Sequence, residues 1–184
     1  MIYRTGYERK KRLWFFTCLF MICLSLAGCS DKRKTFNCPF TELAWGSTAD
    51  DMTDAEGENS DSYPSIYNGV TYTYKKRYLD YDGIVKYMYD DNEKLCNISW
   101  SYAGEDAVSV TEVYEAVCAD TEKLFGKGED DDGVGNYCRI WITDTGTVMA
   151  NAVITNDTTV MQIAYMSPEV SRLSGTGDEA VSRD

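Results

Sequence analysis

The sequence predicts an α+β protein of two repeats, each a helix followed by a three-stranded antiparallel meander, with the helices packed on one sheet face. Three observations lead to this fold class. Residues 109–126 carry apolar side chains at helical spacing, and the segments before and after them alternate as strands do. Residues 156–165 also align without a gap with residues 91–100, which indicates an internal repeat.

These patterns divide the chain into five parts. We expect a signal peptide at residues 1–28, a tether at 29–41, the two repeats at 42–104 and 105–168, and a flexible tail at 169–184. The tail is expected to fray because it holds few apolar residues. Without residues 1–28 the chain keeps 156 of its 184 residues, a length that suits one domain or two small ones.

The N-terminus has the layout of a secretory signal. Five basic residues and one acidic residue precede an uncharged run of fourteen residues, 13–26. A membrane-spanning helix needs about 20 apolar residues, so this run is too short to prefer spanning. It fits the apolar region of a signal peptide that ends in small residues.

The end of this run, Leu26-Ala27-Gly28-Cys29, resembles the lipobox of bacterial lipoproteins. The resemblance implies that Leu26, Ala27 and Gly28 are the recognition sequence and that cleavage occurs before Cys29. It further implies that the Cys29 thiol carries a diacylglycerol, which attaches the protein to the extracytoplasmic face of a cell membrane. The alternative is a retained N-terminal anchor with an incidental cysteine, and it also leaves the remaining chain tethered outside the cytoplasm.

The mature chain is strongly acidic. Residues 1–28 take five of the 18 basic and one of the 30 acidic residues, leaving 13 and 29 and a net charge of −16. Such a surface repels nucleic acid and anionic headgroups, so a partner attracted by net charge would be cationic or a divalent metal. The alternative is that the acids only keep a tethered domain soluble.

Four cysteines remain once the signal is removed and Cys29 is acylated: Cys38, Cys96, Cys118 and Cys138. Four thiols allow three pairings, and the sequence is compatible with a disulfide between Cys118 and Cys138 or between Cys96 and Cys138. Cys96 and Cys118 also fit apolar patterns as small buried side chains. Without a histidine or a C-x-x-C pair, the usual zinc patterns are missing, and no metal or cofactor is predicted.

The first repeat begins with a short helix. Ser47 and Thr48 are suited to cap it, Asp50 and Asp51 favour its first turn, and Gly57 favours its end. Three alternating segments follow, at residues 70–78, 83–91 and 94–102. Asp82-Gly83 and Asp91-Asn92 are the expected turns between them.

The second repeat contains the clearest helix. Its apolar stripe is formed by Val110, Val113, Tyr114, Val117, Cys118, Thr121, Leu124 and Phe125. Ser109 with Glu112 fits a capping box, and Gly126 fits the end of the helix. Three further strands are expected at residues 137–143, 147–155 and 159–167, and the stripe of the helix would cover the meander.

The start at residues 44–57 and the tyrosine-rich meander after it resemble the helix-then-three-strand modules of small bacterial lipoproteins. Such modules occur in BamE-like proteins of outer-membrane assembly and, as a tandem pair, in beta-lactamase inhibitor proteins. In layout the resemblance extends over about residues 42–166, and it implies a protein-binding module without catalytic residues.

Catalysis that depends on histidine is excluded because the chain has none. A pair of carboxylates for glycoside hydrolysis is compatible with the composition, but the acids gather in predicted turns, where solvation explains them. The acidic run at residues 129–132 lacks the alternating ligands of a calcium loop, so a solvated loop is favoured.

The fourteen tyrosines are the remaining feature with functional meaning. If Ile84, Met88 and the helix stripe form the core, Tyr87 and Tyr89 lie on the outer face as a binding patch. The favoured alternative buries these tyrosines, because a packed face usually holds the larger side chains.

Two functional hypotheses follow from the sequence. The first is a lipid-anchored binding or envelope-assembly module without catalytic activity, whose partner is an unknown protein or a glycan of the cell envelope. The alternative is a carboxylate-dependent hydrolase of cell-envelope glycans. A hydrolase of this kind needs two carboxyl groups about 5 to 9.5 Å apart in a cleft, whereas a binding module needs only a complementary surface.

Overall fold

The computed structural model describes residues 36–132 and 135–175. In this part of the chain the order is α2 (Ala49–Glu56), β1 (Asp61–Pro64), β2 (Asn68–Tyr78), β3 (Tyr81–Asp90), β4 (Leu95–Ala103), α3 (Ala107–Phe125), β5 (Glu129–Asp130), β6 (Tyr137–Thr143), β7 (Gly146–Ile154), β8 (Thr159–Met166) and α4 (Pro168–Gly175). The signal peptide and the four lipobox residues lie outside the described residues. None of the described helices is long and apolar enough to cross a membrane.

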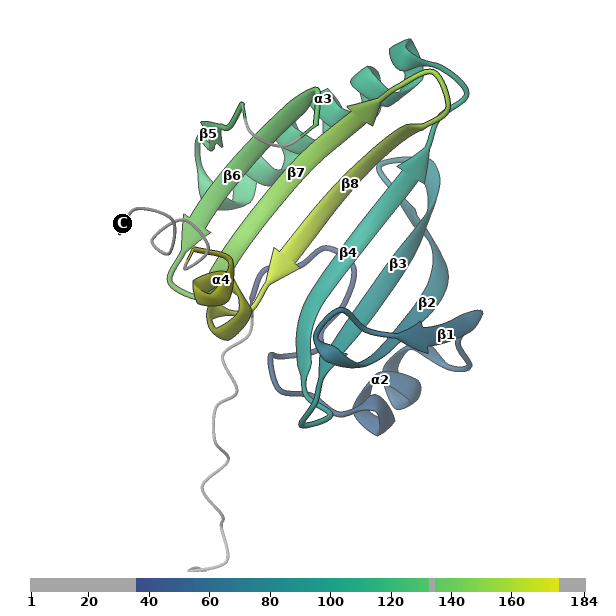
Figure 1. Ribbon diagram of the computed structural model, residues 1–184, viewed down its shortest axis with the longest axis vertical. Coiled ribbons are helices and arrows are strands. Elements are labelled where there is room, and N and C mark those ends of the chain that lie inside the picture. The colour runs from purple at the N-terminus through teal and green to yellow at the C-terminus, as the bar shows by residue number, and fades with distance from the viewer. Residues whose placement is uncertain (1–35, 133–134, 176–184) are drawn as a thin grey trace, which may run out of the picture. The chain divides into compact units, whose positions relative to one another are not determined.

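All the strands belong to one antiparallel sheet (Figure 1), in the order β1-β2-β3-β4-β8-β7-β6-β5. The predicted pair of helix-plus-three-strand repeats is therefore wrong. Two short strands, β1 and β5, extend the sheet at its two ends, and β4 pairs directly with β8 at its centre. Six consecutive residues of β4, Leu95–Trp100, are buried, as expected of a central strand rather than an edge strand.

The hydrophobic core lies on one face of this sheet, between the strands and α3. Six residues of the predicted stripe on α3 are buried: Val110, Val113, Tyr114, Val117, Cys118 and Thr121. They pack in one cluster with core-facing residues of the central strands, among them Ile98, Trp100, Ile163 and Tyr165. Leu124, the seventh member of the predicted stripe, is instead 45% exposed.

Helices α2 and α3 each begin with a capping box. Thr48 caps α2 with Asp51 as its partner, as the sequence predicts. The cap of α3 is Asp106 with Ser109, so the predicted cap at Ser109 with Glu112 is wrong by three residues. Gly57 and Gly126 end the two helices with φ of 83° and 79°, which glycine adopts at little cost.

The turn between β2 and β3 differs from the prediction. Leu79 and Asp80 form it, with φ of 48° and 68°, and Tyr78 pairs with Tyr81 across it. Gly83, which was expected in the turn, lies within β3. A Cβ at Gly83 would overlap the indole of Trp100, so this glycine allows the largest core side chain to lie against the strand.

The predicted tether and the predicted tail are both partly packed against the domain. At the end of the predicted tether, Phe36 and Phe40 are 7% and 3% exposed and belong to the hydrophobic core. At the start of the predicted tail, Pro168–Gly175 form α4, and Val170 is buried. Burial of these apolar side chains holds the end of the tether and the start of the tail against the domain.

The four cysteines of the described chain are free thiols, so neither disulfide that the sequence suggests is formed in this structure. Cys96 and Cys118 are buried, in agreement with a packing role. Burial raises the pKa of the Cys96 thiol to about 12 and that of Cys118 to about 11.

Candidate functional site

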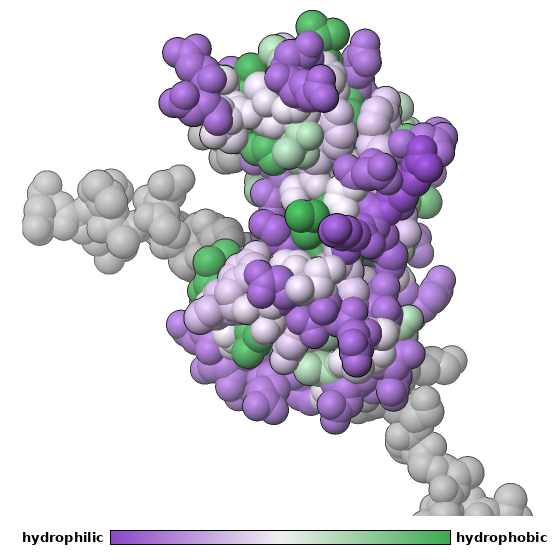
Figure 2. Space-filling model, turned by 90° about the vertical axis from the view of Figure 1, so that its right-hand side faces the viewer, coloured by the Kyte–Doolittle hydropathy of each residue, from purple (hydrophilic) through white to green (hydrophobic). Residues whose placement is uncertain are grey.

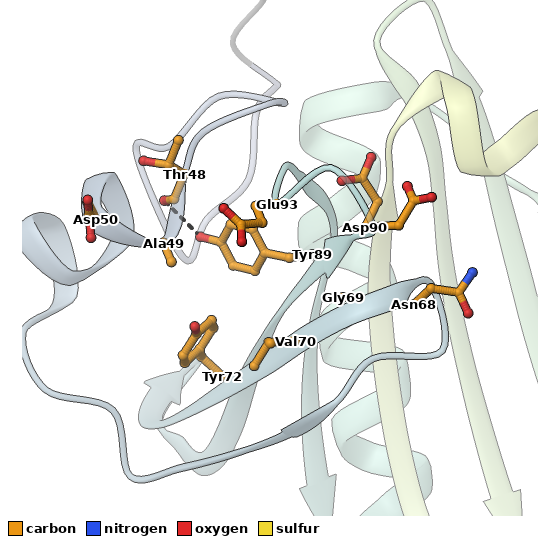
Figure 3. A pocket seen from close by; sticks show the side chains of 11 residues that line it. Thr48, Ala49, Asp50, Asn68, Gly69, Val70, Tyr72, Tyr89, Asp90 and Glu93 are labelled. Carbon is orange, nitrogen blue, oxygen red and sulfur yellow. Dashed lines mark hydrogen bonds between the residues drawn. The ribbon is translucent and has the colours of Figure 1, made fainter.

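A groove lies between the N-terminus of α2 and the end of the β2–β3–β4 meander (Figure 3). Its volume is about 470 Å³. The residues that line it are Thr48, Ala49, Asp50, Asn68, Gly69, Val70, Tyr72, Tyr89, Asp90, Asp91 and Glu93. They come from four parts of the chain, namely the start of α2, the start of β2, the end of β3 and the turn after β3.

Backbone hydrogen bonds hold the start of α2 beside the meander. The Gly46 N–H donates to the Leu95 carbonyl at 3.0 Å, and the Leu95 N–H donates to the Ser47 carbonyl at 2.9 Å. The Tyr89 hydroxyl, on β3, donates to the Thr48 carbonyl at 3.1 Å (Figure 3). These contacts fix the cap of α2 at one wall of the groove.

Two tyrosines form the aromatic side of the groove. The rings of Tyr72 and Tyr89 meet edge to face, with centroids 5.7 Å apart. Tyr89 is 2% exposed, while Tyr72 is partly exposed. Burial is the main cause that raises the pKa of Tyr89 far above its ordinary value, so its hydroxyl stays protonated and remains a donor to Thr48.

The turn after β3 supplies most of the acids. The Asp90 carboxylate accepts from the backbone N–H groups of Asn92 and Lys94, both at 2.9 Å. Asp91 accepts from the side chain of Asn92 at 2.8 Å. Glu93 has a φ of 58°. Its carboxylate makes no hydrogen bond or ion pair with the described residues, which leaves it available to a ligand.

Charge is the most distinctive property of the groove. Asp50, Asp90, Asp91 and Glu93 contribute four carboxylates, and none of the lining residues is a lysine or an arginine. An ammonium or guanidinium group is attracted to such a site, and the face of a tyrosine adds a cation–π interaction. The groove is therefore suited to a cation carried on an apolar stem.

The structure corrects the predicted binding patch at Tyr87 and Tyr89. Tyr87 is fully buried, and its hydroxyl donates to a Glu56 carboxylate oxygen at 2.5 Å. Tyr89 lines the groove but is only 2% exposed. The two do not form an exposed patch, because α2 and the residues before it cover this face of β3.

A second polar cluster lies under the segment before α2. Lys76 places its Nζ atom 2.7 Å from both carboxylate oxygens of Glu56 and 2.5 Å from the Phe40 carbonyl. Each of these groups has a partner within the cluster, so it fastens the segment to the sheet. Among the described residues, no group of three or more Cys, Asp or Glu is placed to hold a metal ion.

The groove was not predicted from the sequence, although two of its acidic residues were identified separately. Asp50 was noted for the helix dipole, and Asp91 for a turn. Their proximity depends on the packing of the start of α2 against the meander, and no local sequence pattern predicts that packing. The only feature of the sequence that indicated the groove was the presence of an acidic helix start and an acidic turn within residues 42–104.

The surface of the domain is mostly polar on the side drawn in Figure 2. Hydrophilic residues cover most of the face turned to the viewer, and hydrophobic residues form small separate groups. A partner that meets this face would find charged and hydrogen-bonding groups rather than a broad apolar patch.

Comparisons with known proteins identify no family for this chain. No protein-family model matches it, and no curated protein matches it. Among solved structures, an extracellular protein containing an SCP domain from Bacillus anthracis aligns over 76% of this chain and 50% of its own, with a TM-score of 0.36 and 13% identity. This chain thus spans about half the length of that protein, and at this level of likeness no property is transferred between them.

Proposed function

We propose that the protein is a lipid-anchored extracytoplasmic binding module that recognises a cationic group of an envelope partner. Diacylglycerol on Cys29 would hold it at the membrane, as the resemblance of Leu26-Ala27-Gly28-Cys29 to a lipobox implies. The described domain would then act by binding and not by catalysis.

One observation carries the binding role: the groove gathers four carboxylates and two tyrosines without a cation in its lining. Four carboxylates without a basic residue in the lining give the groove a negative potential, which attracts an ammonium or guanidinium group. A lysine or arginine side chain of a protein fits best, because its methylene stem can lie along Tyr72 while its charged end meets the acids.

Two acids of the groove, Asp50 and Glu93, give the sharpest test. We would titrate the full-length protein in nonionic detergent micelles with tetralysine and follow the binding by calorimetry. Asp50→Asn together with Glu93→Gln should weaken binding by about tenfold, since each removes one ion pair with a charged ligand. Asp90 is unsuitable because its carboxylate also holds the turn.

A matched control lies at the other end of the same segment. Asp54 and Glu58 are exposed and do not line the groove, so Asp54→Asn with Glu58→Gln removes the same number of charges without touching the site. Equal losses in the control and in the double variant would mean that tetralysine senses only net charge, and the proposal would fail. Lack of binding by the unaltered protein would also refute it.

A further inference from the structure

The register of the sheet shows which residues lie together at one of its ends. One row of directly paired residues crosses seven strands: Ile142, Thr147, Met166, Asn97, Met88, Thr71 and Tyr63. This row is close to the β1–β2, β3–β4 and β6–β7 turns. Figure 1 shows α2 and α4 beside the same end of the sheet, which we call the lower end.

The two most exposed large hydrophobic side chains of the described chain are at the lower end. Ile142 is 84% exposed near the end of β6, and Ile66 is 81% exposed in the turn between β1 and β2. Tyr63, at the other end of the row from Ile142, is 41% exposed. Single exposed hydrophobic residues are common on proteins, but here the most exposed ones share one end of the sheet.

The chain enters the described domain at this end as well. The ring of Phe36 stacks on that of Trp45, with centroids 3.7 Å apart. The Trp45 Nε1 atom donates to the Thr145 carbonyl at 2.7 Å, in the β6–β7 turn. Phe36 is therefore held beside the turn that follows Ile142, and Trp45 remains partly exposed there.

The segment before Phe36 limits how far this end can be from a membrane. Phe36 follows Cys29 by seven residues. An extended chain covers about 3.3–3.6 Å per residue, so these residues span at most about 25 Å. A diacylglycerol on Cys29 would therefore keep the lower end of the domain within this distance of the bilayer.

We propose that the lower end lies against a lipid bilayer, with Ile66 and Ile142 in its interfacial layer and Trp45 at the level of the headgroups. The inference rests on the lipid anchor of the proposed function. Aliphatic side chains gain free energy by leaving water for the interfacial layer, and tryptophan prefers the headgroup region. The anchor holds the surface close to the bilayer, so contacts of a few side chains are enough to orient the domain.

Charge determines which lipids suit this contact. The acidic groove is at the lower end too, because Asn68 and Asp90 pair where β2 begins and β3 ends. Its four carboxylates repel anionic headgroups, whereas a zwitterionic headgroup has no net charge to repel. A bilayer of zwitterionic phospholipid is therefore the partner that fits both the apolar side chains and the acids.

Quenching of added tryptophans tests the contact. We would place the full-length protein, purified with its anchor, in vesicles of phosphatidylcholine and phosphatidylethanolamine with brominated acyl chains, which quench tryptophan on contact. Ile66→Trp and Ile142→Trp report on the lower end. Ile84→Trp and Val108→Trp are the controls, at residues 45% and 65% exposed. Ile84 is four residues from Met88 of the row, and Val108 follows the far end of β4.

We expect the fluorescence added at positions 66 and 142 to be quenched at least about twofold more strongly than that added at 84 and 108. All four positions are exposed, and an unchanged thermal midpoint confirms that each variant is folded. Flotation with the vesicles but equal quenching at the four positions would overturn the contact and leave the anchor intact. If the unaltered protein does not float with the vesicles, the anchor fails, and this contact fails with it.

Discussion

Glu56 and Lys76 join the end of α2 to the middle of β2, with the ammonium 2.7 Å from both carboxylate oxygens. The side chains are 13% and 29% exposed, so the pair is largely shielded from water. Tyr87 and the Phe40 carbonyl complete the cluster. This contact connects three segments that are distant in the sequence.

Removal of the Glu56 charge should therefore destabilise the protein. In Glu56→Gln the amide remains able to accept from Tyr87, but Lys76 loses its counterion in a partly buried site. We expect a loss of about 1–3 kcal/mol in the free energy of unfolding, measured by urea denaturation. Asp54→Asn on the same helix is the control, and equal stabilities of the two variants would contradict the expectation.

Gly83→Ala should strain the core. The added methyl group would overlap the Trp100 indole, and the Trp100 side chain is fully buried. Overpacking of this kind costs about 1–3 kcal/mol. A lower thermal midpoint and a shift in tryptophan fluorescence are the expected results, and an unchanged midpoint would show that the indole moves aside freely.

The buried thiols give the stability a defined dependence on pH. Their pKa values in the folded protein are about 12 for Cys96 and about 11 for Cys118, against about 8.5 in an unfolded chain. A raised pKa means that folding favours the protonated thiol. Its contribution is complete below about pH 8.5 and is lost as the pH rises toward 11 to 12.

Alkylation checks this expectation directly. At pH 8 iodoacetamide should modify Cys96 and Cys118 slowly in the folded protein and rapidly in urea, because the thiolate is the reactive form. Peptide mass spectrometry separates these sites from the others. Rapid modification of either thiol in the folded protein would contradict their burial.

The lipid anchor is tested by Cys29→Ala. Without the thiol no diacylglycerol can be attached, so we expect loss of labelling by a fatty-acid probe and release or mislocalisation of the protein in fractionated cells. Cys38→Ala is the matched control, since it removes a cysteine nine residues further along the chain. Unchanged labelling of Cys29→Ala would refute the anchor.

Local patterns predicted most of the secondary structure. The cap of α2 at Thr48 and the buried stripe of α3 were both found from spacing alone, because they depend on neighbours three and four residues apart. The turn at Leu79 and Asp80 was missed since leucine is an unusual residue at positive φ, although aspartate is a common one. Asp82-Gly83 supplied a stronger signal nearby, but Gly83 serves the packing of Trp100 instead.

The spacing of residues along the chain could not predict which strands pair with each other. The pairing of β4 with β8 joins Ser99 to Ala164, and alternation within each strand is the same whichever edges meet. The groove depends on this level of structure. For that reason its acids were identified in the sequence only separately, in a helix start and in a turn.

The order of the strands has a consequence for encounters between copies of this protein at high concentration. The long strands lie inside the sheet, and the two outermost strands are the shortest, with four residues in β1 and two in β5. Pro64 further removes an N–H group from β1. Each outermost strand offers only a short run of backbone to a neighbouring copy, which disfavours joining of sheets edge to edge through β1 or β5.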